Sequence, residues 1–295
     1  MIVDKPLVSI ALCTYNGEKY ITGQLDSIIN QNYPNLEIII IDDKSTDNTV
    51  HILKSYKEKH NIIKLFVNQD NIGFNKNFKK ALDNCSAEYI AIADQDDIWF
   101  PEKISVLING IKDNLLFYHD SEYIDESGIS SGKTTRSHHR FVNGDCSKNL
   151  LYYNCISGHA SLIRKELINL TPKFSENLYY DWWLAYTAAC TGRIDYTKEI
   201  LVKHRKHPAS STGKDKTDPK ALRVEHLNLF VKHALTPESL RRLVTNLLSG
   251  YAELKHKKFS KNLFYLLIAN YKDLFYIRKR SLLSQLKLVI KESSV

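Results

Sequence analysis

Four apolar runs in the first hundred residues limit the folds open to this chain. They cover residues 7–13, 36–41, 62–67 and 89–93. Each run is nearly continuous in hydrophobicity, which is typical of strands covered on both faces of a sheet. Helix-like segments separate them, at about 18–30, 46–60 and 74–84, and Ser45 is the expected N-cap of the second helix. The alternation predicts an α/β fold with a doubly wound, mostly parallel sheet.

The fourth apolar run ends in the segment Asp94-Gln95-Asp96-Asp97. Three carboxylates so close together repel one another, and a divalent cation that binds their oxygens removes the repulsion. The segment therefore indicates a metal site, or alternatively a solvated acidic turn that only caps the next helix. Polar residues also follow the other three runs, at 14–18, 42–45 and 68–73. Because ligands bind beyond the carboxyl ends of such strands, we expect these segments to share one site.

Composition narrows the class of protein. The chain has 295 residues, with 43% hydrophobic and 25% charged residues, which fits a globular protein. Five cysteines without Cys-x-x-Cys spacing favour a reducing compartment. We expect no signal peptide, because residues 1–6 lead directly into a strand, and no apolar run reaches transmembrane length. These features predict a cytoplasmic location.

The later part of the chain changes character. Residues 116–119 and 194–202 are predicted strands, 181–190 a helix, and 127–149 a loop. Helical patterns then occupy 221–234, 237–248 and about 260–291. We therefore predict two domains, an α/β domain over 1–215 and a basic α-helical region over 216–295.

These blocks together resemble the family 2 inverting glycosyltransferases, which have the GT-A fold. The resemblance covers residues 6–207 and rests on motifs at Val8–Asn16, Ile41–Asp47, Asn71–Gly73, Asp94–Trp99 and Asp181–Trp183. Within that family, the resemblance is to a bacterial rhamnosyltransferase-like subgroup. It implies metal-dependent transfer of one sugar from a nucleotide-sugar donor, dTDP- or UDP-linked, to a hydroxyl of a surface polysaccharide or lipid-linked glycan.

The family pattern also implies residue roles. Asp181 is the expected general base, which removes a proton from the acceptor hydroxyl. Asp96, with Asp94 and His207 and with Asp97 as a further candidate, is expected to hold Mg²⁺ or Mn²⁺ on the diphosphate. Asp43 is expected to contact the nucleotide base. The rest of the expected donor pocket consists of Thr14, Tyr15, Asn16, Glu18, Gly73, Asp94 and Gln95.

Each of these roles has a simpler alternative. Tyr15 would then only pack at a strand end, Asp43 would only cap a helix, and Asp181 would only be the N-cap of its helix. His204 and His207 would be ordinary surface histidines. At position 44 the chain has Lys where the family has Gly, so a turn with positive φ would be strained there.

Two further motifs were assigned by position. Gly158-His159 is expected to face the donor sugar or the acceptor. Only one face of the helix that begins near Asp181 can meet a ligand, so either Trp182 or Trp183 is expected in the core.

Other functions were weighed against this one. A nucleotidyltransferase needs a Gly-rich basic loop after the first strand, and residues 13–19 offer only Gly17 and Lys19. A dinucleotide oxidoreductase is disfavoured because no Gly-x-Gly-x-x-Gly follows that strand. A processive synthase is disfavoured because the Gln-x-x-Arg-Trp motif is absent. A non-catalytic nucleotide-sugar or membrane-binding scaffold remains the alternative from another class.

The net charge of +8 lies in the C-terminal tail, which has twelve basic and four acidic residues from Glu238 onward. With apolar residues such as Leu263, Leu267, Tyr271 and Phe275, the tail resembles an amphipathic helix for an anionic membrane surface. Alternatively these residues pack on the catalytic domain or on a second subunit, which leaves a homodimer open. Nucleic acid is not an expected partner, because no base-reading motif accompanies the charge.

Overall fold

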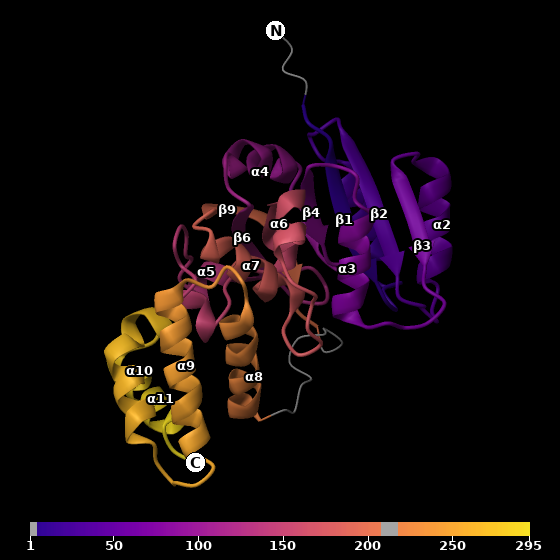
Figure 1. The fold of residues 1–295 in the computed structure, drawn as a ribbon. Helices are drawn as coiled ribbons and strands as arrows, with labels where there is room; N and C mark the ends of the chain where they lie inside the picture. The colour runs from indigo at the N-terminus through magenta and orange to yellow at the C-terminus, as the bar shows by residue number, and fades with distance from the viewer. Residues whose placement is uncertain (1–4, 208–217) are drawn as a thin grey trace.

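The computed structural model describes residues 5–207 and 218–295. Within them, one sheet has the strand order β3-β2-β1-β4-β8-β6-β9-β5, and β7 pairs with β6 (Figure 1). The strands are β1 (Val8–Thr14), β2 (Leu36–Asp42), β3 (Ile63–Val67), β4 (Tyr89–Ala93), β5 (Ile98–Trp99), β6 (Leu116–Ile124), β7 (Ser130–Thr134), β8 (Ser161–Arg164) and β9 (Ile194–Arg205).

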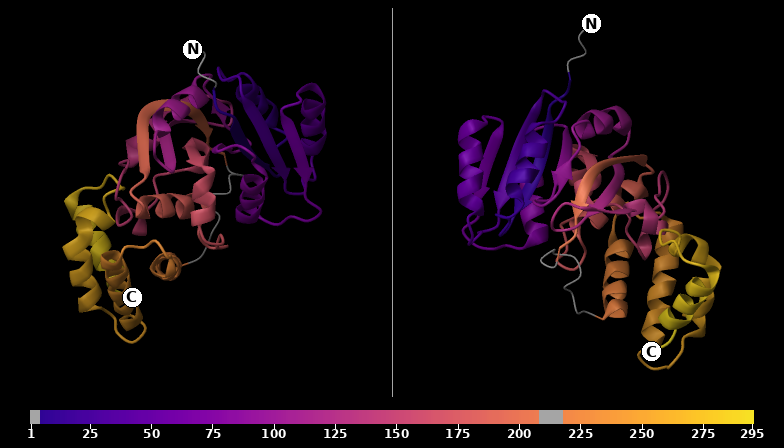
Figure 2. Two further views of the ribbon diagram at one scale, coloured as in Figure 1. Left: turned by 45° about the horizontal axis from the view of Figure 1, so that its top comes forward. Right: turned by 180° about the vertical axis from the view of Figure 1, so that it is seen from behind.

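Helices cover both faces of this sheet, and four more follow it. The first group is α1 (Ile21–Ile29), α2 (Thr49–Lys59), α3 (Phe74–Asn84), α4 (Lys103–Ile111), α5 (Thr135–His138), α6 (Lys165–Leu170) and α7 (Tyr180–Cys190). The C-terminal group is α8 (Pro219–Lys232), α9 (Glu238–Glu253), α10 (Lys261–Leu274) and α11 (Leu282–Glu292). Figures 1 and 2 show this group on the opposite side of the molecule from β1–β3.

The first four strands agree with the sequence prediction. β3, β2, β1 and β4 are mutually parallel, so their carboxyl ends lie along one edge. The prediction that all four are covered on both faces is wrong for β3, where Phe66 and Val67 are exposed because the strand forms the sheet edge. Ser45 is not the N-cap of α2, which begins at Thr49; the Ser45 hydroxyl instead donates to Asp42 at 2.6 Å.

The second half of the sheet is mixed. β8 runs antiparallel to β4, β6 is antiparallel to β8, and β9 is parallel to β6. β5 pairs antiparallel with the carboxyl-terminal part of β9, which brings residues 94–97 beside residues 203–207. The predicted loop over 127–149 instead contains β7 and α5, because residues 130–134 pair with β6.

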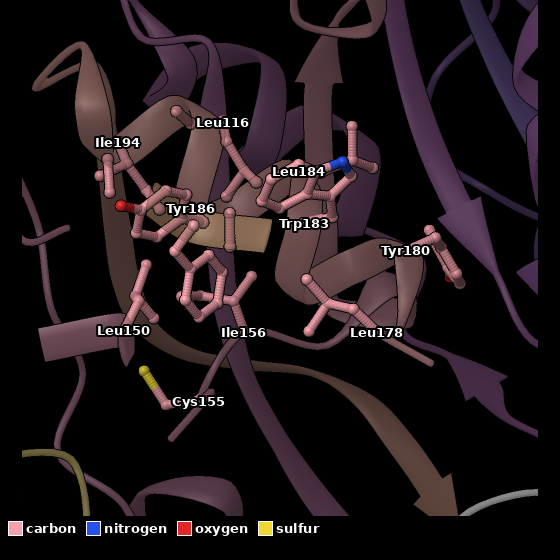
Figure 3. Close-up of a cluster of buried hydrophobic side chains, with 14 of the residues drawn as sticks. Leu116, Leu150, Cys155, Ile156, Leu178, Tyr180, Trp183, Leu184, Tyr186 and Ile194 are labelled. Carbon is pink, nitrogen blue, oxygen red and sulfur yellow. The ribbon is translucent and has the colours of Figure 1, made fainter. Parts of the chain in front are cut away.

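Two hydrophobic cores lie on opposite faces of the sheet. One joins α1, α2 and α4 through Leu25, Leu53 and Leu107. The other joins α3, α6 and α7 and extends into the C-terminal helices. Figure 3 shows part of this second core, where the rings of Trp183 and Tyr186 stack at 6.0 Å. Trp183 is buried, as expected for one of the two adjacent tryptophans.

The C-terminal helices share this second core. Phe230 of α8 lies 4.2 Å from the Tyr186 ring, and Leu263 and Leu267 of α10 are fully buried. The expected apolar residues of the tail therefore pack inward rather than forming a free amphipathic face. The predicted helix over 260–291 is two helices, α10 and α11, separated by residues 275–281. In the described part of the chain, no helix combines the length and apolarity needed to cross a membrane.

Candidate active site

A cleft of about 1410 Å³ opens at the carboxyl ends of the parallel strands. The structure brings together at this cleft ten of the eleven predicted site residues: Thr14, Tyr15, Asn16, Asp43, Gly73, Asp94, Gln95, Asp96, Asp181 and His207. Glu18 does not line the cleft. Its carboxylate accepts the Asn48 N–H at 2.8 Å, at the N-terminus of α2.

The loop after β1 is fixed against the acidic segment. The Gln95 side chain accepts the Tyr15 N–H at 2.9 Å and donates to the Tyr15 carbonyl at 3.1 Å. A Cβ on Gly17 would lie 2.3 Å from Gln95 Oε1, so a larger residue here would displace the Gln95 side chain from Tyr15. The Tyr15 ring remains 47% exposed. The contacts leave the ring as a surface on which a planar ligand can stack.

Asp43 organises the loop after β3. Its carboxylate accepts hydrogen bonds from Asn68 Nδ2 at 2.8 Å, from the Ile72 N–H at 2.8 Å and from the Gly73 N–H at 2.9 Å. The adjacent Lys44 has φ of 64°, which is the positive-φ turn that the sequence predicted. This wall of the cleft is therefore held by a buried carboxylate with three donors.

Two carboxylates of the acidic segment lie close to two histidines from elsewhere in the chain. Ligand atoms of Asp94, Asp97, His159 and His204 lie within 4.8 Å of one another. His204 Nδ1 is 3.0 Å from Asp97 Oδ1, and the rings of His159 and His204 stack at 4.1 Å. Asp97 Oδ2 is buried and has no hydrogen-bond partner among the described residues.

The carboxylates of this segment differ in acidity. Burial, together with the negative charge of Asp97, raises the pKa of Asp94 to about 6. Asp96 has its pKa raised to about 6 by burial and by the charges of Asp97 and Asp94. Burial acts on Asp97 in the same direction, but His204, His159 and the Arg205 N–H outweigh it and hold the pKa of Asp97 below its usual range. Asp97 and His204 therefore form a buried ion pair beside two carboxyls that ionise reluctantly.

The structure divides the predicted ligand residues between two groups. His207 Nε2 lies 2.6 Å from Asp96 Oδ2, so those two predicted residues do meet. Asp94 instead groups with Asp97, His159 and His204. Sequence reasoning proposed Asp97 but not His159 or His204 as ligands, because the pairing of β5 with β9 and of β8 with β4 brings the histidines to the acidic segment. The spacing His204-x-x-His207 at a strand end was the available signal.

A buried lysine, Lys103, contacts the segment that carries His159. Lys103 has no exposed surface, and its Nζ donates to the His159 carbonyl at 2.6 Å and lies 3.4 Å from the Trp99 ring. Burial lowers the pKa of Lys103 well below its usual value. The contact fixes the segment that carries Gly158 and His159, and sequence reasoning did not identify it.

Asp181 lies in the first turn of α7 and also lines the cleft. Its carboxylate accepts the Gly158 N–H at 3.2 Å and the Trp182 N–H at 2.6 Å. Burial raises the pKa of Asp181 to about 7, because these two hydrogen bonds only partly offset desolvation and Asp94 adds a like charge. Trp182 lines the cleft, and its Nε1 donates to the Leu150 carbonyl at 2.7 Å. A carboxylate with this pKa can take up a proton near neutral pH.

Comparison with known proteins places this arrangement in a family. Residues 9–170 match the model described as glycosyl transferase family 2. An uncharacterised glycosyltransferase of Haemophilus influenzae is 31% identical over 217 residues, which are 68% of this chain and 66% of that protein. The chain therefore spans about two thirds of that relative.

Solved structures show the same fold. The crystal structure of TarS residues 1–349 from S. aureus, in complex with UDP-GlcNAc, has a TM-score of 0.64 at 19% identity and covers 91% of this chain and 81% of that one. The mannosyltransferase PcManGT of Pyrobaculum calidifontis, in complex with GDP-Man and Mn²⁺, has a TM-score of 0.57 at 17% identity, covering 92% and 74%. These likenesses confirm the predicted GT-A fold.

Proposed function

Because the chain belongs to glycosyl transferase family 2, we propose that it transfers one sugar from a nucleotide-sugar donor to an acceptor hydroxyl, with inversion at the anomeric carbon. The donor is dTDP- or UDP-linked, and the acceptor is a bacterial surface polysaccharide or a lipid-linked glycan. The observation that carries the proposal is one cleft that Asp94, Asp96 and Asp181 line together. Transfer requires both a site for the diphosphate and a proton acceptor.

Asp181 is the proposed base. It removes the proton of the acceptor hydroxyl as the oxygen attacks the anomeric carbon and the bond from that carbon to the diphosphate oxygen breaks. The Gly158 and Trp182 N–H groups hold the carboxylate in place. Its raised pKa suits it for this role, since a base acts best when its pKa is near the working pH.

The nucleotide part of the donor is proposed to bind in the cleft beside the loops that follow β1, β2 and β3. Tyr15 offers an exposed ring to the nucleotide base, and Asp43 holds the wall at residues 71–73. The carboxylate of Asp43 already accepts three hydrogen bonds from the protein, so only its remaining lone pairs are open to a base.

A divalent cation fits the residues of the acidic segment, Asp94 to Asp97. Asp94 and Asp96 ionise reluctantly, and Asp97 Oδ2 has no partner among the described residues, so an added positive charge would stabilise this group. Asp94 and Asp96, with His207 beside Asp96, would hold Mn²⁺ or Mg²⁺. A bound cation would supply Lewis-acid stabilisation of the departing diphosphate.

Donor hydrolysis without acceptor tests the proposal against a non-catalytic scaffold. UDP-, dTDP- and GDP-sugars would be incubated with the protein and Mn²⁺, and release of nucleoside diphosphate measured. We expect slow release from one class of donor, lost in the Asp96→Asn variant. Donor binding with no release and no transfer would favour the scaffold instead.

We also propose that α11 binds a membrane surface. Leu282, Leu283, Leu286 and Ile290 are exposed on this helix, and Lys287 and Lys291 flank them. An apolar face edged by basic residues complements an anionic lipid surface. This would place the protein on the inner face of the cell membrane, near a lipid-linked acceptor. A homodimer through the same face is the competing outcome.

The subgroup and the division into two domains are also part of the proposal. The rhamnosyltransferase-like subgroup rests on the Asp94–Trp99 and Asp181–Trp183 motifs. The division into domains 1–215 and 216–295 is supported by the change from strands to helices after β9, which ends at Arg205.

A further inference from the structure

The cleft extends beyond Asp181 toward the C-terminal helices, and its lining changes there. Arg223 on α8 and Arg278 after α10 both line it, together with Tyr152 and Tyr153. Typical small-molecule sites have volumes of about 300–1,000 Å³. The cleft, at about 1410 Å³, therefore has room for a second substrate beside a nucleotide sugar.

The two arginines, here called the arginine pair, surround one aromatic ring. The Arg223 guanidinium lies 5.5 Å from the centre of the Tyr153 ring, and the Arg278 guanidinium lies 5.3 Å from it. Arg223 also stacks on Tyr152 at 4.3 Å. Stacking fixes the plane of a guanidinium. One N–H group of Arg223 donates to the Tyr152 carbonyl, and the remaining N–H groups of the pair are available for a carboxylate or phosphate.

The arginine pair has no counter-charge within the described residues. The arginines that form ion pairs there are Arg164, Arg193, Arg241 and Arg242. One donor of the pair, the Nε of Arg223, is buried and has no hydrogen-bond partner in the described chain. A buried N–H without a partner is costly, and an anion between the two guanidiniums would also reduce the repulsion between their charges.

The position of the arginine pair relative to Asp181 indicates which of the two substrates it would bind. Trp182, next to the proposed base, packs against His226 of α8 at 5.0 Å, and Arg223 lies one turn earlier on that helix. The predicted donor residues Tyr15, Asp43 and Asp94 instead follow β1, β2 and β4, in another part of the same cleft. The arginine pair is therefore on the acceptor side of the base.

We propose that Arg223 and Arg278 bind a carboxylate or phosphodiester group of the acceptor glycan, so that the acceptor is an anionic polymer; this rests on the proposed glycosyl transfer. Lys206 is not included, because it lies close enough to Asp94 to influence that carboxyl and so belongs to the acidic segment.

Glycan binding tests the proposal without the unknown natural acceptor. The probes are a hexasaccharide of alternating glucuronic acid and N-acetylglucosamine, its carboxyl-reduced neutral counterpart, and a glycerol-phosphate hexamer. Titration calorimetry with the full chain, UDP and Mn²⁺ would compare wild type, Arg223→Gln, Arg278→Gln and a control. The control is Arg280→Gln, an exposed arginine two residues from Arg278 that does not line the cleft.

We expect at least one anionic oligomer to bind more tightly than the neutral one, and to bind less tightly at high salt. Each pair variant should weaken that binding about tenfold, the effect of losing one charge-assisted contact, while Arg280→Gln binds like wild type. The carboxylate and phosphodiester arms identify which group is bound. Equal binding of neutral and anionic oligomers, or unchanged binding by both pair variants, would overturn the proposal.

Two further outcomes distinguish this proposal from a donor-site role for the arginines and from the proposed glycosyl transfer. If the pair variants lose UDP affinity as much as glycan affinity, the arginines belong to the donor site and the proposal is wrong. If anionic binding follows the arginines while no donor is hydrolysed or transferred, the anion site stands and the proposed glycosyl transfer fails.

Discussion

The Gly158 N–H donates to Asp181 Oδ2 at 3.2 Å, which ties the segment before β8 to the first turn of α7. A Cβ on Gly158 would lie 1.9 Å from the Tyr180 hydroxyl, so the contact exists only because this residue has no side chain. Lys103 holds the same segment from the other side through the His159 carbonyl. The position of the proposed base therefore depends on a glycine and a buried lysine as well as on α7.

The Gly158→Ala substitution tests this dependence. The added methyl must displace Tyr180 or move the Gly158 N–H away from Asp181, because the clash is with a fully packed ring. We expect a loss of stability of roughly 1–3 kcal/mol and at least about a tenfold loss of turnover. Chemical denaturation and transfer kinetics measure the two effects.

The matched control is Gly23→Ala. Gly23 lies in α1, and nothing lies within 4 Å of its added Cβ. Alanine in a helix should stabilise the protein by about 0.5–1 kcal/mol and leave turnover unchanged. Equal turnover for both alanine variants would show that Gly158 does not position the base.

Asp181→Asn should separate catalysis from folding. Asparagine keeps the shape of the side chain but cannot accept the proton, so we expect turnover to fall by roughly 10²–10⁴ with donor affinity little changed. A matching loss of nucleotide affinity would indicate a structural cap instead.

The same variant has a predicted effect on stability. The folded-state pKa of Asp181 is raised to about 7, so the ionised carboxylate destabilises the fold increasingly above the unfolded-state pKa of about 4, and fully above about 7. Asp181→Asn should therefore have a higher Tm than wild type at pH 8 and a similar Tm at pH 4. Calorimetry at both values checks the sign.

The pH dependence of kcat/KM follows from the proposed base. The base must be deprotonated to act, so kcat/KM should fall tenfold per unit below about pH 7 and level off above it. Asp94 and Asp96 also titrate near 6 without a cation, but a bound cation favours their ionised forms. An acidic limb that moves to lower pH as Mn²⁺ is increased would belong to those carboxyls and contradict the assignment to Asp181.

Asp96→Asn should remove metal-stimulated binding of nucleoside diphosphate. Asp96 is one of two carboxyls whose ionised form a cation would stabilise, so its loss should abolish most of the rise in Tm that UDP with Mn²⁺ gives the wild type. The Tm without ligands must stay near wild type for the result to count. Near-normal turnover of this variant in chelator-treated buffer would exclude the metal role.

Flotation with liposomes tests the role of α11. Wild type should float with anionic vesicles at low salt, less at high salt, and not with neutral vesicles. Leu283→Ser combined with Ile290→Ser should abolish flotation, because both side chains are exposed and their loss leaves the core intact. Ile129→Ser, another exposed apolar residue, is the control. Absence of flotation with both vesicle types would reject the membrane role, and a concentration-dependent dimer lost in the double variant would indicate a second copy.

The sequence alone determined the first half of the fold and the edge where the site lies. Parallel strands buried on both faces produce long apolar runs, and their carboxyl ends must meet, so Asp43 and Asp94 could be placed together from the pattern. Asp181 could be proposed only through the family motif. These inferences needed local signals and the order of motifs, which a sequence contains.

Only the tertiary structure decided how the rest of the site is assembled. His159 and His204 reach Asp97 because β9 pairs with β5 and β8 pairs with β4, and neither pairing has a local sequence signal. Lys103, Arg223 and the exposed face of α11 are similar cases, since a basic or apolar residue on a helix has the same local pattern whether it faces a core, a cleft or solvent. Their environment is set by long-range packing, and the structure is what reveals it.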